Sequence, residues 1–222
     1  MDIKTTIKND CLEILKYFVE KGAKIDFNNY EGVDDIEEED EDMSPLSLAV
    51  KYASESRSSY QWQLRVNIVK FLIEKGCDIH SNDEYPLRKA AIMGDIEIVK
   101  LLVENGADVH ALHDWALDNA AKHCHLDVVI YLVENGADIH ADNNAALLNS
   151  VGNGYLEVVK YLVENGANIH VDNENALRTS ILESDSDMIN YLLEKGAIVN
   201  EDIIKIAKSQ HKDISNLFKK YY

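Results

Sequence analysis

One glycine recurs through this sequence at a fixed interval, and that interval limits the folds open to the chain. The last four intervals are each 30 residues, whereas the first is 54 and so contains 24 extra residues. A period of about 20 to 50 residues is typical of arrays of small stacked units. We therefore predict a repeat protein. The recurring glycines are Gly22, Gly76, Gly106, Gly136, Gly166 and Gly196.

An amphipathic helix is predicted immediately before each of these glycines. In the copy that ends at Gly106, apolar residues recur at the spacing of one helix face: Ile96, Val99, Leu102 and Val103. Glycine adopts the left-handed conformation that ends a helix without a steric penalty from Cβ. We therefore expect each glycine to be the stop signal of the helix before it.

A shorter helix is predicted ahead of each amphipathic one. It carries a leucine at the same place in each regular copy and small residues that allow close helix packing. Polar residues precede it, and we expect them to accept free N–H groups at the helix start. The fold class is therefore all-α, a solenoid of roughly seven stacked helix-turn-helix units. The repeated leucines are Leu87, Leu117, Leu147 and Leu177, and the polar pairs are Asn82–Asp83, His113–Asp114, Asn143–Asn144 and Asn173–Glu174.

The repeat resembles the ankyrin repeat over nearly the whole chain. Ser44–Pro45–Leu46 and Tyr85–Pro86–Leu87 match the family's T-P-L-H helix start, and Val128–Val129 matches the V-V pair of its second helix. Residues 136–140, GADIH, match its G-A-D-V-N ending. The start motif is incomplete, because Trp115–Ala116–Leu117–Asp118 is typical here. The resemblance implies an ankyrin-like α-solenoid that binds other proteins.

The period of 30 residues is shorter than the usual ankyrin period of about 33. The missing residues fall where the family builds its β-hairpin fingers, so we expect shortened fingers. A 30-residue period with ENGADIH endings is similar to the ankyrin repeat proteins of giant amoeba-infecting viruses.

The chain is predicted to form a single ankyrin repeat domain over 1–222. Residues 31–42 hold nine carboxylates and no Lys or Arg, which is typical of a solvated loop. The second insert, around residues 52–65, lengthens a helix pair or its turn; its Tyr60 and Trp62 either contact a partner or cover that turn. The expected segments are an N-terminal cap unit at 1–26, an acidic insert at 27–44, a unit with an extended inter-helix segment at 45–80, four regular units at 81–200 and a C-terminal cap at 201–222.

Charge and cysteine content narrow the function classes. The net charge is −18, from 22 Lys and Arg against 40 Asp and Glu. This balance argues against nucleic acid and anionic membranes as partners. Three widely spaced cysteines, with no signal peptide or transmembrane segment, fit an intracellular protein in the cytoplasm of the producing or host cell. We expect it to be a monomer.

Two groups of residues have side chains that could bind a metal. His80, His110, His140 and His170 recur once per unit, too far apart to share one ion, and we expect each ring to bond loop backbone. Residues 123–125, His-Cys-His, lack further ligands at a recognisable spacing. No nucleophile, phosphate-binding or metalloprotease motif is present. We therefore expect no cofactor, no metal and no enzymatic activity.

A partner surface is expected where the copies differ, because the constant residues build the stack. In ankyrin relatives, the resemblance places that surface on the finger tips and the exposed side of the first helix. Trp115 is the strongest candidate, although it could instead fill the space left by the shortened loop. Two other functions remain as alternatives to a binding module. The chain could be a structural component of a larger particle, or an adapter to a degradation machinery. The lack of a further C-terminal domain counts against the adapter. The candidate residues are Tyr85, Arg88, Lys89, Trp115, Asp118, Asn119, Leu148, Asn149 and Arg178, with Asn175 and Thr179 beside them.

Overall fold

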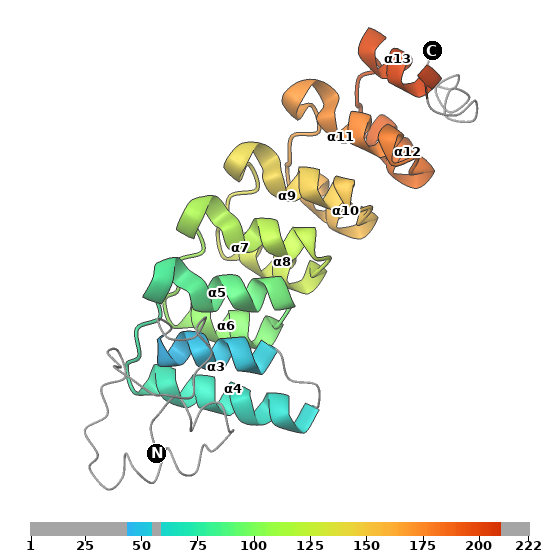
Figure 1. The fold of residues 1–222 in the computed structure, drawn as a ribbon. Coiled ribbons are helices and arrows are strands. Elements are labelled where there is room, and N and C mark those ends of the chain that lie inside the picture. The colour runs from blue at the N-terminus through green and yellow to red at the C-terminus, as the bar shows by residue number, and fades with distance from the viewer. Residues whose placement is uncertain (1–43, 55–58, 210–222) are drawn as a thin grey trace, which may run out of the picture. The chain divides into compact units, whose positions relative to one another are not determined.

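The structure is a computed structural model that describes residues 44–54 and 59–209. Within these residues, eleven helices and no strand are present, which confirms the predicted all-α ankyrin-like solenoid (Figure 1). The first cap unit, the acidic insert up to residue 43 and the end of the C-terminal cap lie outside the described residues. The helices are α3 (Pro45–Ser54), α4 (Ser59–Glu74), α5 (Ser81–Met93), α6 (Ile96–Glu104), α7 (Ala111–Lys122), α8 (Leu126–Glu134), α9 (Ala141–Gly152), α10 (Leu156–Glu164), α11 (Val171–Leu182), α12 (Ser186–Glu194) and α13 (Glu201–Ser209).

Contacts divide the chain into two compact units, Met1–Leu112 (unit 1) and His113–Tyr222 (unit 2). In unit 1, α3 packs on α4 and α5, and α6 packs on α4 and α5. In unit 2, α9 packs on α10 and α11, α11 packs on α12 and α13, and α8 contacts α10. Because repeats contact only their neighbours, such a division does not by itself mark two domains. The single domain over 1–222 stays a prediction.

The second helices, α4, α6, α8, α10 and α12, each bury one apolar face, and α6 shows which residues form it. In α6, Ile98, Val99 and Leu102 are fully buried, whereas Ile96 and Val103 are only half-buried. Of the four residues predicted to share this face, Val99 and Leu102 are therefore its buried part, and the structure adds Ile98 to them. The reason is that α6 packs against α5 and also against α4 of the preceding pair, so its buried face is turned toward Ile98.

The glycines that follow the second helices end them as predicted. Gly136 has φ +98°, and its N–H donates to Val133 O at 3.1 Å. The next N–H, that of Ala137, donates back to Leu132 O at 3.0 Å, which closes the last turn of α8. The same conformation recurs after α4, α6, α10 and α12, where glycine also has positive φ.

The polar residues before the first helices do not simply cap them. Asp142, Asn143 and Asn144 have φ of 43°, 60° and 61°, so they form a left-handed turn before the right-handed part of α9. Asn and Asp tolerate this conformation better than most residues. Asn144 is buried, and its Oδ1 accepts the N–H of Asn168 in the next loop at 2.9 Å. It thereby ties one repeat to the next, which the expectation of a helix-start acceptor had missed.

The shortened fingers are confirmed as tight turns without strands in the described part of the chain. In each turn, a side-chain oxygen accepts the backbone N–H of the histidine two residues later. Asp138 Oδ1 accepts the N–H of His140 at 2.8 Å, and Asn168 Oδ1 accepts the N–H of His170 at 3.0 Å. The loop needs no hairpin partner, because its N–H groups are satisfied locally.

The turn within each helix pair gives one stability prediction. Ser184 lies there with φ +56°, at the place where Gly154 occupies the preceding pair with φ +73°. A left-handed non-glycine residue costs about 1–2 kcal/mol. A Ser184→Gly variant should therefore raise the free energy of unfolding by up to about 1 kcal/mol, measured by urea denaturation. The neighbouring Glu183, with φ −78°, is the control: Glu183→Gly should lower that energy.

Candidate interaction surface

The predicted partner-binding residues all lie on first helices. Eight of the nine are half-exposed, and Asn119 alone is buried, with 7% of its surface accessible. Its Nδ2 donates to Trp115 O at 3.0 Å, one turn back along α7. Asn119 therefore supports the helix and does not offer its amide to a partner.

In unit 1, the candidates are Tyr85, Arg88 and Lys89 on α5. The Arg88 guanidinium donates from Nε to Asp83 O at 2.8 Å and from Nη2 to Asn82 O at 2.9 Å. It also lies over the Tyr85 ring, 5.9 Å from the centroid. Arg88 thus holds the carbonyls of the left-handed turn at the start of α5. Replacing it would disturb that turn, so an Arg88 variant cannot report on binding alone.

In unit 2, the half-exposed positions of the first helices differ from copy to copy. Equivalent positions hold Asp118 on α7, Leu148 on α9 and Arg178 on α11, which are acidic, apolar and basic. The residue just before each of them is a fully buried leucine. The core positions therefore repeat while their exposed neighbours diverge. We call this side of α7, α9 and α11 the first-helix face; its residues are Trp115, Asp118, Leu148, Asn149, Asn175, Arg178 and Thr179.

Contacts across the first-helix face hold several of these side chains in place. Asn149 Nδ2 donates to Asp118 Oδ1, so α7 and α9 are joined at this surface. Arg178 Nη2 lies 3.4 Å from Asn173 O, a looser contact than that of Arg88 with its turn. Thr179 Oγ1 donates to Asn175 Oδ1 at 3.4 Å. The face is therefore partly ordered before any partner binds, which reduces the entropy lost on binding.

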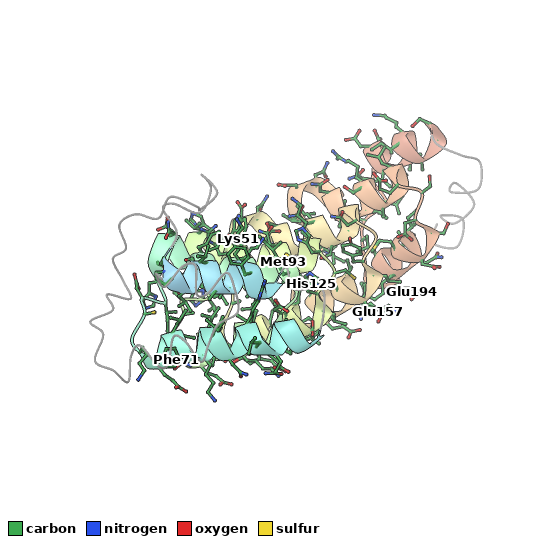
Figure 2. All side chains as sticks on the ribbon, turned by 60° about the horizontal axis from the view of Figure 1, so that its bottom comes forward. Lys51, Phe71, Met93, His125, Glu157 and Glu194 are labelled. Carbon is green, nitrogen blue, oxygen red and sulfur yellow. The ribbon has the colours of Figure 1, made fainter. Side chains whose placement is uncertain are left out.

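The second helices of unit 2 carry a different surface, dominated by carboxylates. Within α8, α10 and α12 there is one basic residue, Lys160, against six Asp and Glu, a formal charge of −5. Figure 2 shows Glu157 of α10 and Glu194 of α12 along the second-helix edge of this unit. Both are exposed. The carboxylates recur at each repeat, whereas the first-helix face changes, so the two surfaces can be tested separately.

A tyrosine in successive second helices links them. Tyr191 Oη donates to Lys160 O at 3.4 Å, and Tyr161 Oη donates to Ile130 O at 3.5 Å. Burial raises the pKa of both hydroxyls, and the charge of the nearby Glu164 or Glu134 adds to the rise in pKa. The tyrosines are therefore neutral donors that connect repeats, with a structural role.

The rings of three of the four loop histidines contact side chains, which corrects for these three the expectation that the rings bond backbone. Nδ1 of His140 lies 3.3 Å from Asn144 Oδ1, and Nδ1 of His170 lies 2.6 Å from Glu174 Oε1. His80 makes the same contact with Glu84. For His110, the backbone N–H donates to Asp108 Oδ1 at 2.9 Å. The spacing of four residues between each histidine and its buried partner was visible in the sequence and could have indicated these pairs.

His123, Cys124 and His125 lie in the turn between α7 and α8. The two imidazole rings stack with centroids 6.2 Å apart and planes 10° apart, and Cys124 is exposed with φ +63°. His123 Nδ1 donates to Asn119 O at 2.8 Å. Over residues 44–54 and 59–209, no three His, Cys, Asp or Glu side chains converge as a metal site would require.

The second insert lengthens α4 to 16 residues, compared with nine in the other second helices. Trp62 on α4 is half-buried, and its Nε1 donates to Asp95 Oδ1 at 3.0 Å. This bond ties the insert to the residue before α6. The indole N–H of Trp62 therefore has a partner within the chain.

Comparison with known families agrees with this architecture. The family model for ankyrin repeats (three copies) matches residues 58–143 and 117–203, which together span 146 of the 222 residues. A search of curated proteins found no significant match. In the part of the chain that the structure describes, no helix is long and apolar enough to cross a bilayer. Ankyrin repeats are general protein–protein interaction modules. The left-handed turns, paired helices and glycine stops recur every 30 residues, and this chain belongs to the ankyrin repeat family.

Proposed function

We propose that this chain is a non-catalytic protein-interaction module that binds a partner protein through the first-helix face of unit 2. The observation that supports this is the divergence of Asp118, Leu148 and Arg178 at one equivalent position, beside leucines that do not change. Divergence at these half-exposed positions is not required by the buried core, whose leucines stay the same. It is useful for recognising a partner with one particular surface.

The chemistry of the first-helix face also supports recognition. Trp115 provides a large, rigid aromatic surface, and aromatic residues with arginine are enriched at the energetic centres of interfaces. Leu148 adds apolar area between an acidic residue on α7 and a basic residue on α11. A partner segment that crosses α9 would meet an apolar centre flanked by charges of opposite sign. Such a pattern fixes the orientation of a partner.

The test is quantitative affinity purification with mass spectrometry on the full chain. We expect a Trp115→Ala, Leu148→Ala, Arg178→Ala triple variant to lose a partner that the unchanged chain captures, by tenfold or more. Loss of two or three interface anchors costs about 2 kcal/mol or more, which corresponds to that factor. The result must then be repeated with the purified partner by calorimetry.

A matched control changes three exposed second-helix residues of the same unit, Glu134, Glu164 and Asp187, to alanine. This control should retain the partner. If it loses the partner and the first-helix variant retains it, the acidic second-helix surface is the interface, and the proposal is wrong. Both variants should keep the helical circular dichroism of the unchanged chain.

We propose further that the protein acts as a monomer inside the cell, without nucleic acid as a partner. The net charge of −18 supports a monomer, because negatively charged chains repel one another. It also disfavours nucleic acid, because these chains repel its phosphates. We also propose that the protein is similar to the ankyrin repeat proteins of giant amoeba-infecting viruses, and the 30-residue period supports this. The identity of the captured partner distinguishes a simple binding module from a particle component or a degradation adapter.

A further inference from the structure

The loop at residues 78–84 in unit 1 contains a strained turn. Asn82, Asp83 and Glu84 have φ of 54°, 53° and 61°, a run of three left-handed residues at the start of α5. L-residues enter this conformation at a cost in free energy, and such runs persist only when their surroundings hold them. The contacts that hold this turn therefore decide whether the loop is closed.

Glu84, the last residue of that turn, is buried, with 4% of its surface accessible. Its Oε1 contacts His80 Nδ1, and its Oε2 is buried without a partner among the residues that the structure describes. A buried carboxylate is costly unless it is paired with a charge or hydrogen-bonded. The charge on the His80 ring is therefore the group that can compensate Glu84.

The same geometry recurs in unit 2, which shows that it is a feature of the repeat. His170 Nδ1 lies 2.6 Å from Glu174 Oε1, Glu174 is 3% accessible, and its Oε2 is also buried without a partner in the described residues. The copy between residues 140 and 144 keeps the histidine contact but has a neutral Asn144 in place of the glutamate. The chain thus contains charged and neutral versions of one loop.

We propose that residues 78–84 form a pH-sensitive latch, in which protonated His80 holds the left-handed turn closed over Glu84 and loss of the proton loosens it. This device is independent of the proposed first-helix face, which lies in the other unit. It would adjust the order of the α4–α5 loop and the start of α5 to the pH of the surroundings.

The charges around His80 have the sign that the latch requires. Glu84 and Asp78 lie on its own loop, and Asp108 lies on the loop that follows α6. The hydrogen bond to Glu84 is the main cause that raises the pKa of His80, followed by the charge of Glu84; burial opposes the rise, and Asp78 and Asp108 add to it. The Arg88 guanidinium bonds the turn carbonyls and is the nearby cation on α5.

The direction of the pH effect follows from this rise. A histidine whose pKa is higher in the closed loop than its ordinary value of about 6.5 stabilises the closed loop fully below that value. The stabilisation is lost as the pH rises through the pKa of the closed loop. The latch is therefore closed in mild acid and loosened in mild base.

The experiment compares loops within one full-length chain. Amide hydrogen exchange at pH 6.0 and pH 8.5, corrected for the intrinsic exchange rate, gives protection factors for residues 78–84 and 138–144. NMR titration of the His80 ring gives its pKa. Protection of residues 78–84 should fall with rising pH by about tenfold for each unit by which that pKa exceeds 6.5. Protection of residues 138–144 should change less, because Asn144 carries no charge.

Two exchanged variants make the test decisive. Glu84→Asn copies the neutral loop and should remove the fall in protection at residues 78–84, while the pKa of His80 moves toward 6.5. Asn144→Glu copies the charged loop and should create such a fall at residues 138–144. The second variant tests the proposal even if the first fails to fold. Equal pH dependence of the two loops in the unchanged chain, or no change at residues 138–144 in Asn144→Glu, would overturn it.

Discussion

A Leu147→Ala variant should have a free energy of unfolding about 2–5 kcal/mol lower than that of the unchanged chain. Leu147 lies on α9 with none of its surface accessible, and the same place holds buried leucines in α5, α7 and α11. Removing its side chain leaves a cavity between α9 and the helices packed on it, α10 and α11. Urea denaturation followed by circular dichroism measures the loss.

The neighbouring Leu148 is the matched control, since it is the same residue type one position later on the same helix. Leu148 is half-exposed on the first-helix face. A Leu148→Ala variant should lose less than about 1 kcal/mol of stability, because less apolar area leaves a packed environment. If the two alanine variants lose the same unfolding free energy, the orientation of α9 described above is wrong.

The second large effect is expected at Gly136. A Gly136→Val variant should lower the free energy of unfolding by about 1–3 kcal/mol, because a β-branched residue is strained at φ +98°. Steric crowding is not the cause: a Cβ built at this position has no atom within 4 Å. Thermal and urea denaturation both measure the effect, and an unchanged melting temperature would contradict the role of Gly136 as the helix stop.

Gly152 provides the opposite case in the same unit. It is the last residue of α9, and a Cβ there would meet only Thr179 Cγ2 at 3.9 Å, an ordinary contact. Gly152→Ala should therefore raise the free energy of unfolding by up to about 1 kcal/mol, because alanine loses less backbone entropy in a helix. Opposite signs at the two glycines would show that backbone conformation, and not residue type, decides the cost.

The constant residues of the repeat were predictable from the sequence because each copy repeats the same local rule. The 30-residue interval, the leucine of each first helix and the glycine after each second helix predicted the helix pairs and their ends. Gly136 could be recognised as a stop because only the local backbone conformation decides where that helix ends. The shortened fingers also followed from the length of the interval, since too few residues remain for a hairpin.

The partners of polar side chains were harder to predict, because they depend on residues brought together by folding. Asn144 was expected at a helix start, yet it is buried and accepts an N–H from the next loop, 24 residues later. Arg88 was chosen as a candidate partner contact without any sign that it also holds the carbonyls of its own turn. Neither result can be read from one copy of the repeat, because both depend on the left-handed turn.

The sequence by itself determined the repeat, the all-α class and the ankyrin family, because helix periodicity and glycine stops act within a few residues. Only the tertiary structure decided which polar residues are buried and which remain at the surface. It buried Asn119 and left Leu148 half-exposed, although their sequence patterns had made both candidates. The physical reason is that accessibility depends on the helices of neighbouring repeats, which cover one side of each first helix and leave the other free.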